Sequence, residues 1–204
     1  MKSWLIALSL VLFATQLATA GDLPDPSCCR CSLDGSMRLL MVPDENGNPN
    51  AAFSVTIINY DCETPLPNVF VEVIIGGQAE GKTRLCDGAS TTGVTDENGF
   101  VSFNIAGGGC FKEHYAVTIR ANGVVIRQYE AVVSPDYAGW DNAGIPGRSS
   151  LSMSPVDLAA FATAYHGGTG AASCHDYDNN GVTGPGDLAV FASAYDGGGT
   201  SCLP

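Results

Sequence analysis

The chain has 204 residues, with 21 acidic and 9 basic side chains, so its formal net charge is -12. Such an acidic surface repels nucleic acid and anionic lipid, and we expect neither as a partner. No segment is long and apolar enough to predict a membrane span.

Residues 1–20 have the three parts of a secretory signal peptide. Lys2 gives a positive start, residues 4–13 form an apolar core, and Ala18-Thr19-Ala20 is a small-residue cleavage signal. We therefore expect a mature chain that begins at Gly21 and is secreted to the extracellular space.

All eight cysteines follow this cleavage site, and three of them lie in a Cys-rich N-terminal segment, residues 21–36. An even number of cysteines in an exported chain predicts disulfides, although eight cysteines allow 105 complete connectivities. Cys174 and Cys202 bracket the last loop and helix, and they are the one pair that we predict. A metal site at Cys28-Cys29-x-Cys31 is the less favoured alternative, since no histidine lies nearby in sequence.

Residues 37–133 have the pattern of strands with one buried face. Every second residue is apolar from Val69 to Ile75 and again from Val101 to Ile105. Turn signals separate the runs, and Asn122-Gly123 predicts a tight hairpin. Short strands divided by such turns predict a β-sandwich.

Residues 134–204 have a different pattern, because a helical segment occurs twice. Residues 157–168 match residues 187–198, thirty positions later. A proline precedes each copy and glycines follow it, which favours helix starts and stops at these points. We expect two short helices that pack one apolar face of each copy against the other: Leu158, Phe161 and Tyr165 against Leu188, Phe191 and Tyr195.

The loop before the second helix has the ligand spacing of a calcium site. Asp176, Asp178 and Asn180 supply side-chain oxygens, and Asp187 closes the set from the first turn of the helix. Val182 would add its backbone carbonyl. The alternative is that these acids and asparagines are only turn formers and helix-start residues. The combined spacing, with a glycine at the sharp turn and a helix directly after, favours calcium.

The first loop is irregular. If Asp136 opens it and Asp157 closes it, the two are 21 positions apart, against 11 between Asp176 and Asp187. We expect this first calcium site to be either lost or remodelled by an insertion, and Asp136 and Asp157 are its candidate ligands.

Two family resemblances follow from these motifs. Residues 67–73 and 93–103 resemble strands of bacterial Ig-like and carboxypeptidase-regulatory-like sandwiches. The duplicated loop and helix resembles dockerin type I repeats, which carry F-hand calcium loops. That resemblance implies docking to a cohesin domain, often in polysaccharide breakdown. Here Pro155-Val156 and Pro185-Gly186 stand where the family often has a polar pair that reads the partner.

The resulting expectation is a mostly β chain: an Ig-like β-sandwich at 37–133, then a small α-helical dockerin-like calcium-binding domain at 134–204. We expect no enzyme, because none of His114, His166 and His175 lies in a nucleophile motif. His175 is expected to be an exposed loop residue.

The leading functional hypothesis is a secreted calcium-binding module that attaches to a cohesin-like or other extracellular protein. One alternative is a structural extracellular or cell-surface protein in which calcium stiffens a helical cap on the sandwich. A carbohydrate-binding accessory module is the other.

Overall fold

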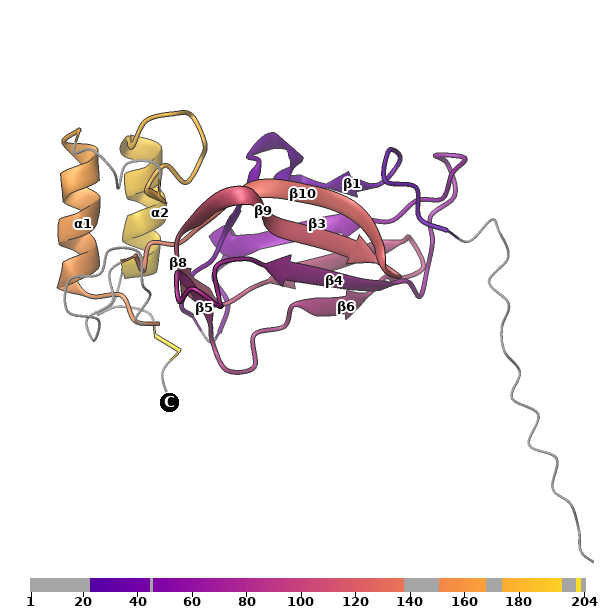
Figure 1. Ribbon diagram of the computed structural model, residues 1–204, viewed down its shortest axis with the longest axis horizontal. Coiled ribbons are helices and arrows are strands. Elements are labelled where there is room, and N and C mark those ends of the chain that lie inside the picture. Colours follow the sequence, from indigo (N-terminus) through magenta and orange to yellow (C-terminus); the bar gives the residue numbers. More distant parts are fainter. Residues whose placement is uncertain (1–22, 45, 138–150, 168–173, 196–200, 203–204) are drawn as a thin grey trace, which may run out of the picture.

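The computed structural model describes residues 23–44, 46–137, 151–167, 174–195 and 201–202 (Figure 1). The predicted signal peptide lies outside these residues. Within them, no helix has the length and apolar character needed to cross a bilayer.

The described part of the chain is mostly β, as expected. Its strands are β1 (Arg30–Cys31), β2 (Arg38–Leu40), β3 (Ala52–Thr56), β4 (Phe70–Ile75), β5 (Thr83–Leu85), β6 (Thr92–Val94), β7 (Phe100–Asn104), β8 (Gly107–Gly109), β9 (Phe111–Ala121) and β10 (Val124–Val133). Two 3-10 turns, η1 (Ser32–Gly35) and η2 (Pro49–Ala51), lie among the strands, and the helices α1 (Pro155–Tyr165) and α2 (Pro185–Tyr195) follow them.

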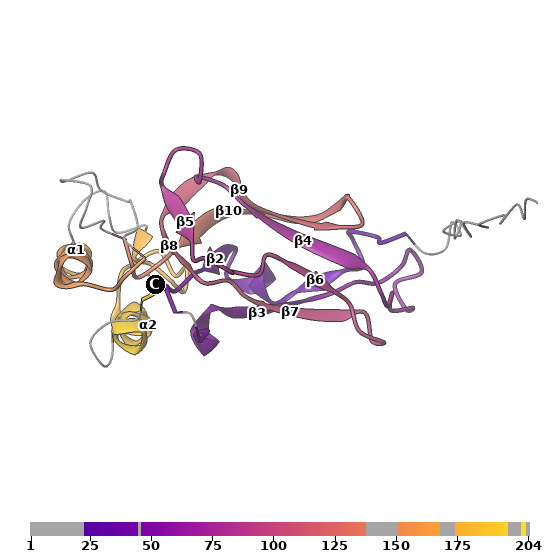
Figure 2. The same ribbon diagram turned by 90° about the horizontal axis from the view of Figure 1, so that it is seen from below.

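The strands form two layers, which Figure 2 shows from the side. One sheet has the order β2-β10-β9-β4-β6, and the other has the order β1-β3-β7. A small third sheet pairs β5 with β8. We call residues 23–133 the β unit. The apolar residues of period two fill its core: Val71 and Val73 of β4 lie in the same buried cluster as Phe53 of β3 and Phe103 of β7.

The hairpin between β9 and β10 has the predicted two-residue turn. Asn122 and Gly123 have φ angles of 45° and 84°, and Ala121 pairs directly with Val124. Two consecutive positive φ angles give the turn a twist that matches that of the paired strands.

Helices α1 and α2 lie side by side at one end of the β unit (Figure 1). The rings of Phe161 and Phe191 stack between them with their centroids 4.7 Å apart. The wider packing prediction is wrong, because Leu158 and Leu188 each stay 42% exposed and Tyr165 stays 39% exposed. The buried faces consist instead of Asp157, Phe161 and Ala164 in α1 and Asp187, Phe191 and Ala194 in α2.

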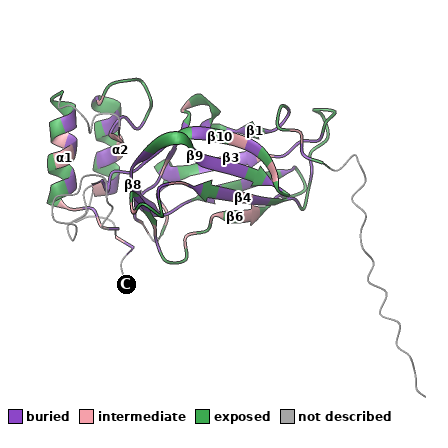
Figure 3. Ribbon diagram, in the orientation of Figure 1, coloured by how far each residue is buried: buried purple, intermediate pink, exposed green. Residues whose placement is uncertain are grey.

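The spacing of the buried positions explains why the leucines are exposed. Each buried face begins with an aspartate whose carboxylate binds backbone amides, continues with a phenylalanine one turn later, and ends with a small alanine. This turns each leucine outward, and Figure 3 shows buried and exposed strips alternating on both helices.

The helix pair shares a core with the β unit. Phe161 and Phe191 belong to the same buried cluster as Val42, Ala131 and Val133. Because β10 continues into this cluster at its C-terminal end, the helices pack on the end of the sheets.

Three disulfides are present, and they correct the predicted pairing. Cys174 is bonded to Cys110 and Cys202 to Cys86, so the predicted Cys174–Cys202 pair is wrong. Cys174 lies beside the start of β9, whereas the chain after α2 returns to Leu151, whose carbonyl accepts a hydrogen bond from the Cys202 amide at 3.1 Å. Both bonds therefore tie the C-terminal part of the chain to the β unit.

The N-terminal cysteines correct the expectation that all eight pair. Cys28 is bonded to Cys62, but Cys29 and Cys31 are free thiols buried in the β core. They are two positions apart at the first strand, so both face the apolar interior. Three disulfides in the described residues are compatible with an extracellular protein.

Replacing Cys110 and Cys174 together by alanine is expected to lower the free energy of unfolding by about 4 kcal/mol in the chain-entropy model, since this bond links residues 64 positions apart. Urea denaturation of the oxidised protein measures this. Limited proteolysis should then cut the chain just before α2, where the loop has lost its anchor. The matched control replaces Cys28 and Cys62, which leaves that loop anchored. Equal cutting in both double variants would contradict the anchoring role.

Candidate metal centre

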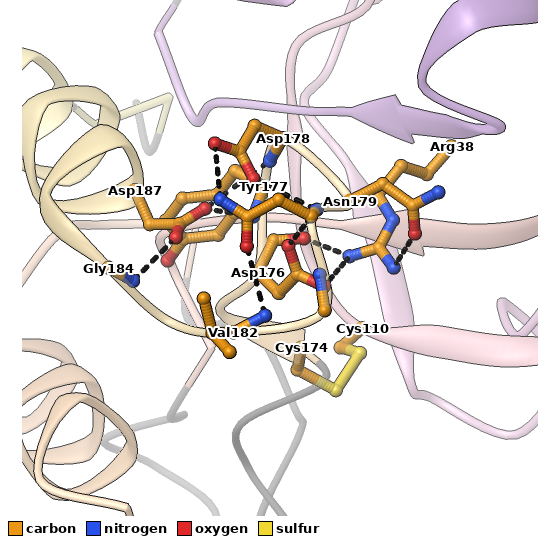
Figure 4. Close-up of polar contacts among 12 residues, drawn as sticks. Arg38, Cys110, Cys174, Asp176, Tyr177, Asp178, Asn179, Val182, Gly184 and Asp187 are labelled. Carbon is orange, nitrogen blue, oxygen red and sulfur yellow. Dashed lines mark hydrogen bonds and ion pairs between the residues drawn. A yellow bond between two sulfur atoms is a disulfide. The ribbon is translucent and has the colours of Figure 1, made fainter.

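Three carboxylates of the second loop converge at the start of α2 (Figure 4). One oxygen from each of Asp176, Asp178 and Asp187 lies within 4.8 Å of the other two. Asp176 and Asp187 are buried, and Asp178 is exposed. The loop closes this tightly because Asn179 and Gly181 adopt positive φ angles of 62° and 92°. We call these three residues the acidic triad.

Backbone amides hold the two buried carboxylates in place. Asp176 accepts from the amides of Asn180 at 3.0 Å and Gly181 at 3.2 Å. Asp187 accepts from the amides of Tyr177, Asp178 and Gly184. Hydrogen bonds to a charged acceptor are the stronger kind, so this set fixes the carboxylates although their charges repel one another.

The remaining predicted ligands border the triad. The amide of Asn180 also donates to Asp178 at 3.1 Å. The side-chain oxygen of Asn180 accepts from the amide of Val182 at 3.0 Å. Val182 is 62% exposed, and its role as a carbonyl ligand stays a prediction.

The donor set fits a hard cation. Carboxylate, amide and carbonyl oxygens are the ligands of divalent ions such as calcium and magnesium, and no soft ligand takes part. Two of the three acids are buried, where unneutralised charge is costly. The arrangement could therefore hold a metal ion.

A buried arginine that the sequence analysis did not identify contacts this loop. Arg38 comes from β2, and its guanidinium is 3.5 Å from the carboxylate of Asp176. It also donates to the backbone carbonyl of Asp176 and to the side-chain oxygen of Asn179. No local pattern marks this residue, because it is 138 positions away from Asp176 in the chain.

The start and the end of the first loop have the same hydrogen bonds as the start and the end of the second loop. The amide of Tyr137 donates to Asp157 at 2.9 Å, just as the amide of Tyr177 donates to Asp187. Ser154 also donates to Asp157, as Gly184 does to Asp187, both from the backbone amide at 2.8 Å. The duplication of the helices therefore extends to the two ends of the loops that precede them.

Asp136 and Asp157 are both fully buried, and one oxygen of Asp136 accepts from the amide of Leu151 at 2.8 Å. The predicted first site includes residues 138–150, which lie outside the described residues. In the described ranges, the acidic triad of the second loop is the group of acids that could hold a metal.

His175 is buried, so its prediction as an exposed loop residue is wrong. The ring is fully covered and lies edge-on to Tyr137 and Phe161. Its Nδ1 is 3.0 Å from the hydroxyl of Tyr177, and its Nε2 has no hydrogen-bond partner within the described part of the chain. Burial lowers the pKa of His175 to about 4. The imidazole is therefore neutral at physiological pH and serves as part of the aromatic core.

Comparison with known proteins gives no significant match to a family model, a curated protein or a solved structure. The dockerin-like and Ig-like resemblances therefore stay predictions.

With a chelator present, substitution of Asp187 should destabilise the protein far more than substitution of Asp178. Asp187→Ala leaves the buried amides of Tyr177 and Gly184 without their acceptor and is expected to destabilise the protein by roughly 2–4 kcal/mol. Asp178→Ala removes an exposed acid from a repulsive cluster and should change stability by less than about 0.5 kcal/mol. Urea denaturation in EDTA measures both variants. A loss in Asp187→Ala as small as that expected for Asp178→Ala would contradict the structural role of Asp187.

Acid should destabilise the protein through His175. Its pKa is about 4 in the folded state and 6.5 in the unfolded state, so the unfolded chain binds more protons between these values. The free energy of unfolding should therefore fall as the pH drops from 6.5 to 4, by roughly 3 kcal/mol at most. Urea denaturation in chelator at several pH values measures the slope. His175→Phe should show a shallower slope, and an unchanged slope would assign the acid sensitivity to other groups.

Proposed function

We propose that this chain is a secreted, non-catalytic module that binds calcium in its second loop and uses the fixed helix pair to attach to another extracellular protein. The observation that carries the proposal is the acidic triad, whose oxygens lie within 4.8 Å of one another at the start of α2. In this proposal the β unit is an Ig-like sandwich and the helix pair is dockerin-like.

Calcium is the ion that suits the loop best. It accepts six to eight oxygens in flexible geometry, whereas magnesium demands a near-ideal octahedron. Asn180 is hydrogen-bonded to Asp178, and the backbone carbonyl of Val182 is the further oxygen that the ligand spacing predicts, so both would extend the set of oxygens. The triad carries three negative charges and Arg38 one positive charge, so a divalent ion would balance the remainder.

Calcium would act by thermodynamic linkage. The oxygens converge only in the folded loop, so the ion stabilises the folded state and not the unfolded chain. At a free concentration about a thousand times the dissociation constant, this adds roughly 4 kcal/mol to the free energy of unfolding. Because Asp187 belongs to the first turn of α2, the ion would hold the loop to the helix.

The outward surface of the helix pair supports a protein partner. Leu158 of α1 and Leu188 of α2 occupy equivalent places in the repeat, and each is 42% exposed. Val156 and Tyr165 are also partly exposed, at 37% and 39%. Apolar side chains that repeat on two neighbouring helices are suited to contact with another protein.

A calcium-stiffened cap is the second candidate function, and specific contacts favour it. Two disulfides and a shared apolar core join the helix pair to the β unit. The ion would then rigidify this junction, and the outer surface would bind no partner. Both candidates require calcium, so a partner experiment must separate them.

Isothermal titration of the mature protein with calcium should show binding at the second loop. Asp178→Ala should weaken binding at least tenfold, because it removes a triad carboxylate without unfolding the loop. Calcium should also raise the melting temperature, and EDTA should reverse this. Absence of heat and of any thermal shift at millimolar calcium would refute the calcium proposal.

Attachment is tested with the immobilised mature protein and the secreted proteins of its source. Docking predicts calcium-dependent capture of a defined protein, and the double variant L158D/L188D should lose capture while it still binds calcium. The cap predicts no capture by either form. Capture that persists in the double variant would place the contact elsewhere on the molecule.

A further inference from the structure

Arg38 brings a positive charge from the β unit directly to the acidic loop. Its side chain and that of Asp176 are each only 7% exposed, and they form an ion pair at 3.5 Å. Figure 4 shows the guanidinium reaching the loop on the side of Asp176 and Asn179, away from Gly184. A buried charge in this position acts on the site with little screening by solvent.

Arg38 also reduces the net negative charge of the site. Asp176, Asp178 and Asp187 contribute three negative charges as carboxylates. Among the described residues, Arg38 is the only basic side chain that forms an ion pair with the triad. The local balance is therefore two negative charges, and the affinity of an oxygen site for a cation depends on this balance.

We propose that Arg38 is a built-in counter-charge that tunes the acidic triad to a divalent ion and disfavours ions of higher charge. This inference rests on the proposed function, since it concerns the cation that the triad would bind. Arg38 is a positioning residue: it touches Asp176 and Asn179 and acts on the ion through them and through its field.

Two effects of Arg38 must be separated. Its hydrogen bonds to Asp176 and Asn179 pre-order the loop, and their loss would weaken every cation of similar size alike. Its charge repels a cation in proportion to the charge of that cation. The ratio of terbium(III) affinity to calcium affinity cancels the first effect and retains the second, because both ions prefer oxygen ligands and are similar in radius.

The experiment titrates terbium(III) and calcium into the mature protein and follows terbium luminescence and calorimetric heat. Arg38→Gln removes the charge, and it should raise the terbium-to-calcium affinity ratio roughly three- to tenfold over the unmodified protein. Arg38→Lys keeps the charge but loses the forked hydrogen bonds. It should leave the ratio unchanged even if both affinities fall.

A second variant keeps the test decisive if Arg38→Gln does not fold. Asn179→Asp keeps Arg38 and places a carboxylate beside its guanidinium. Residue 179 is exposed and has a positive φ angle that aspartate tolerates, so the loop should survive the change. This variant should also raise the ratio.

The outcomes separate the two claims. If the unmodified protein binds neither ion, the proposed function fails and this inference fails with it. If the unmodified protein binds calcium but the charge-changing variants leave the terbium-to-calcium affinity ratio unchanged, the calcium site is supported and the counter-charge role of Arg38 is wrong. Arg38 would then only hold the loop in place.

Discussion

The fold of the C-terminal part depends on one interaction, the capture of backbone amides by a buried aspartate at the start of each helix. Asp157 binds the amide of Tyr137, and Asp187 binds the amide of Tyr177. Each contact joins the start of a loop to the first turn of the helix that the loop precedes. Without it, a short helix and an irregular loop would have no fixed angle between them, and the carboxylates of the second loop would not converge.

The same interaction explains why structural and metal-binding roles overlap at this site. A carboxylate that accepts several amide hydrogen bonds is held in one orientation, and an oriented carboxylate is what a hard cation needs. The disulfide between Cys110 and Cys174 and the ion pair of Arg38 hold the second loop from the side of the β unit. An ion bound by the triad would add to these two anchors.

The features that local patterns control could be predicted from the sequence. The alternation in β4 and β7, the turn at Asn122-Gly123 and the two helices all follow from neighbouring residues, and the triad follows from its spacing. Partners distant in sequence could not be predicted: Cys86 for Cys202, Arg38 for Asp176, and the burial of His175 depend on how the layers meet. The apolar character of Leu158 and Leu188 does not predict their exposure, because the small alanines let the phenylalanines pack while the leucines point outward.

The pairing of β2 with β10 has a consequence for the charge at the acidic loop. These strands run parallel, with Arg38 beside Ala131 and the fully buried Leu39 beside Val132. Neighbouring residues of a strand point to opposite faces, so a slip of one residue would exchange the places of the arginine and the leucine. The slipped state would bury a guanidinium among hydrocarbons and expose Asp176 to an aliphatic neighbour. Correct alignment of β2 with β10 therefore also places the charge that neutralises the loop. A misaligned chain would be destabilised both by its buried guanidinium and by the unpaired carboxylate of Asp176.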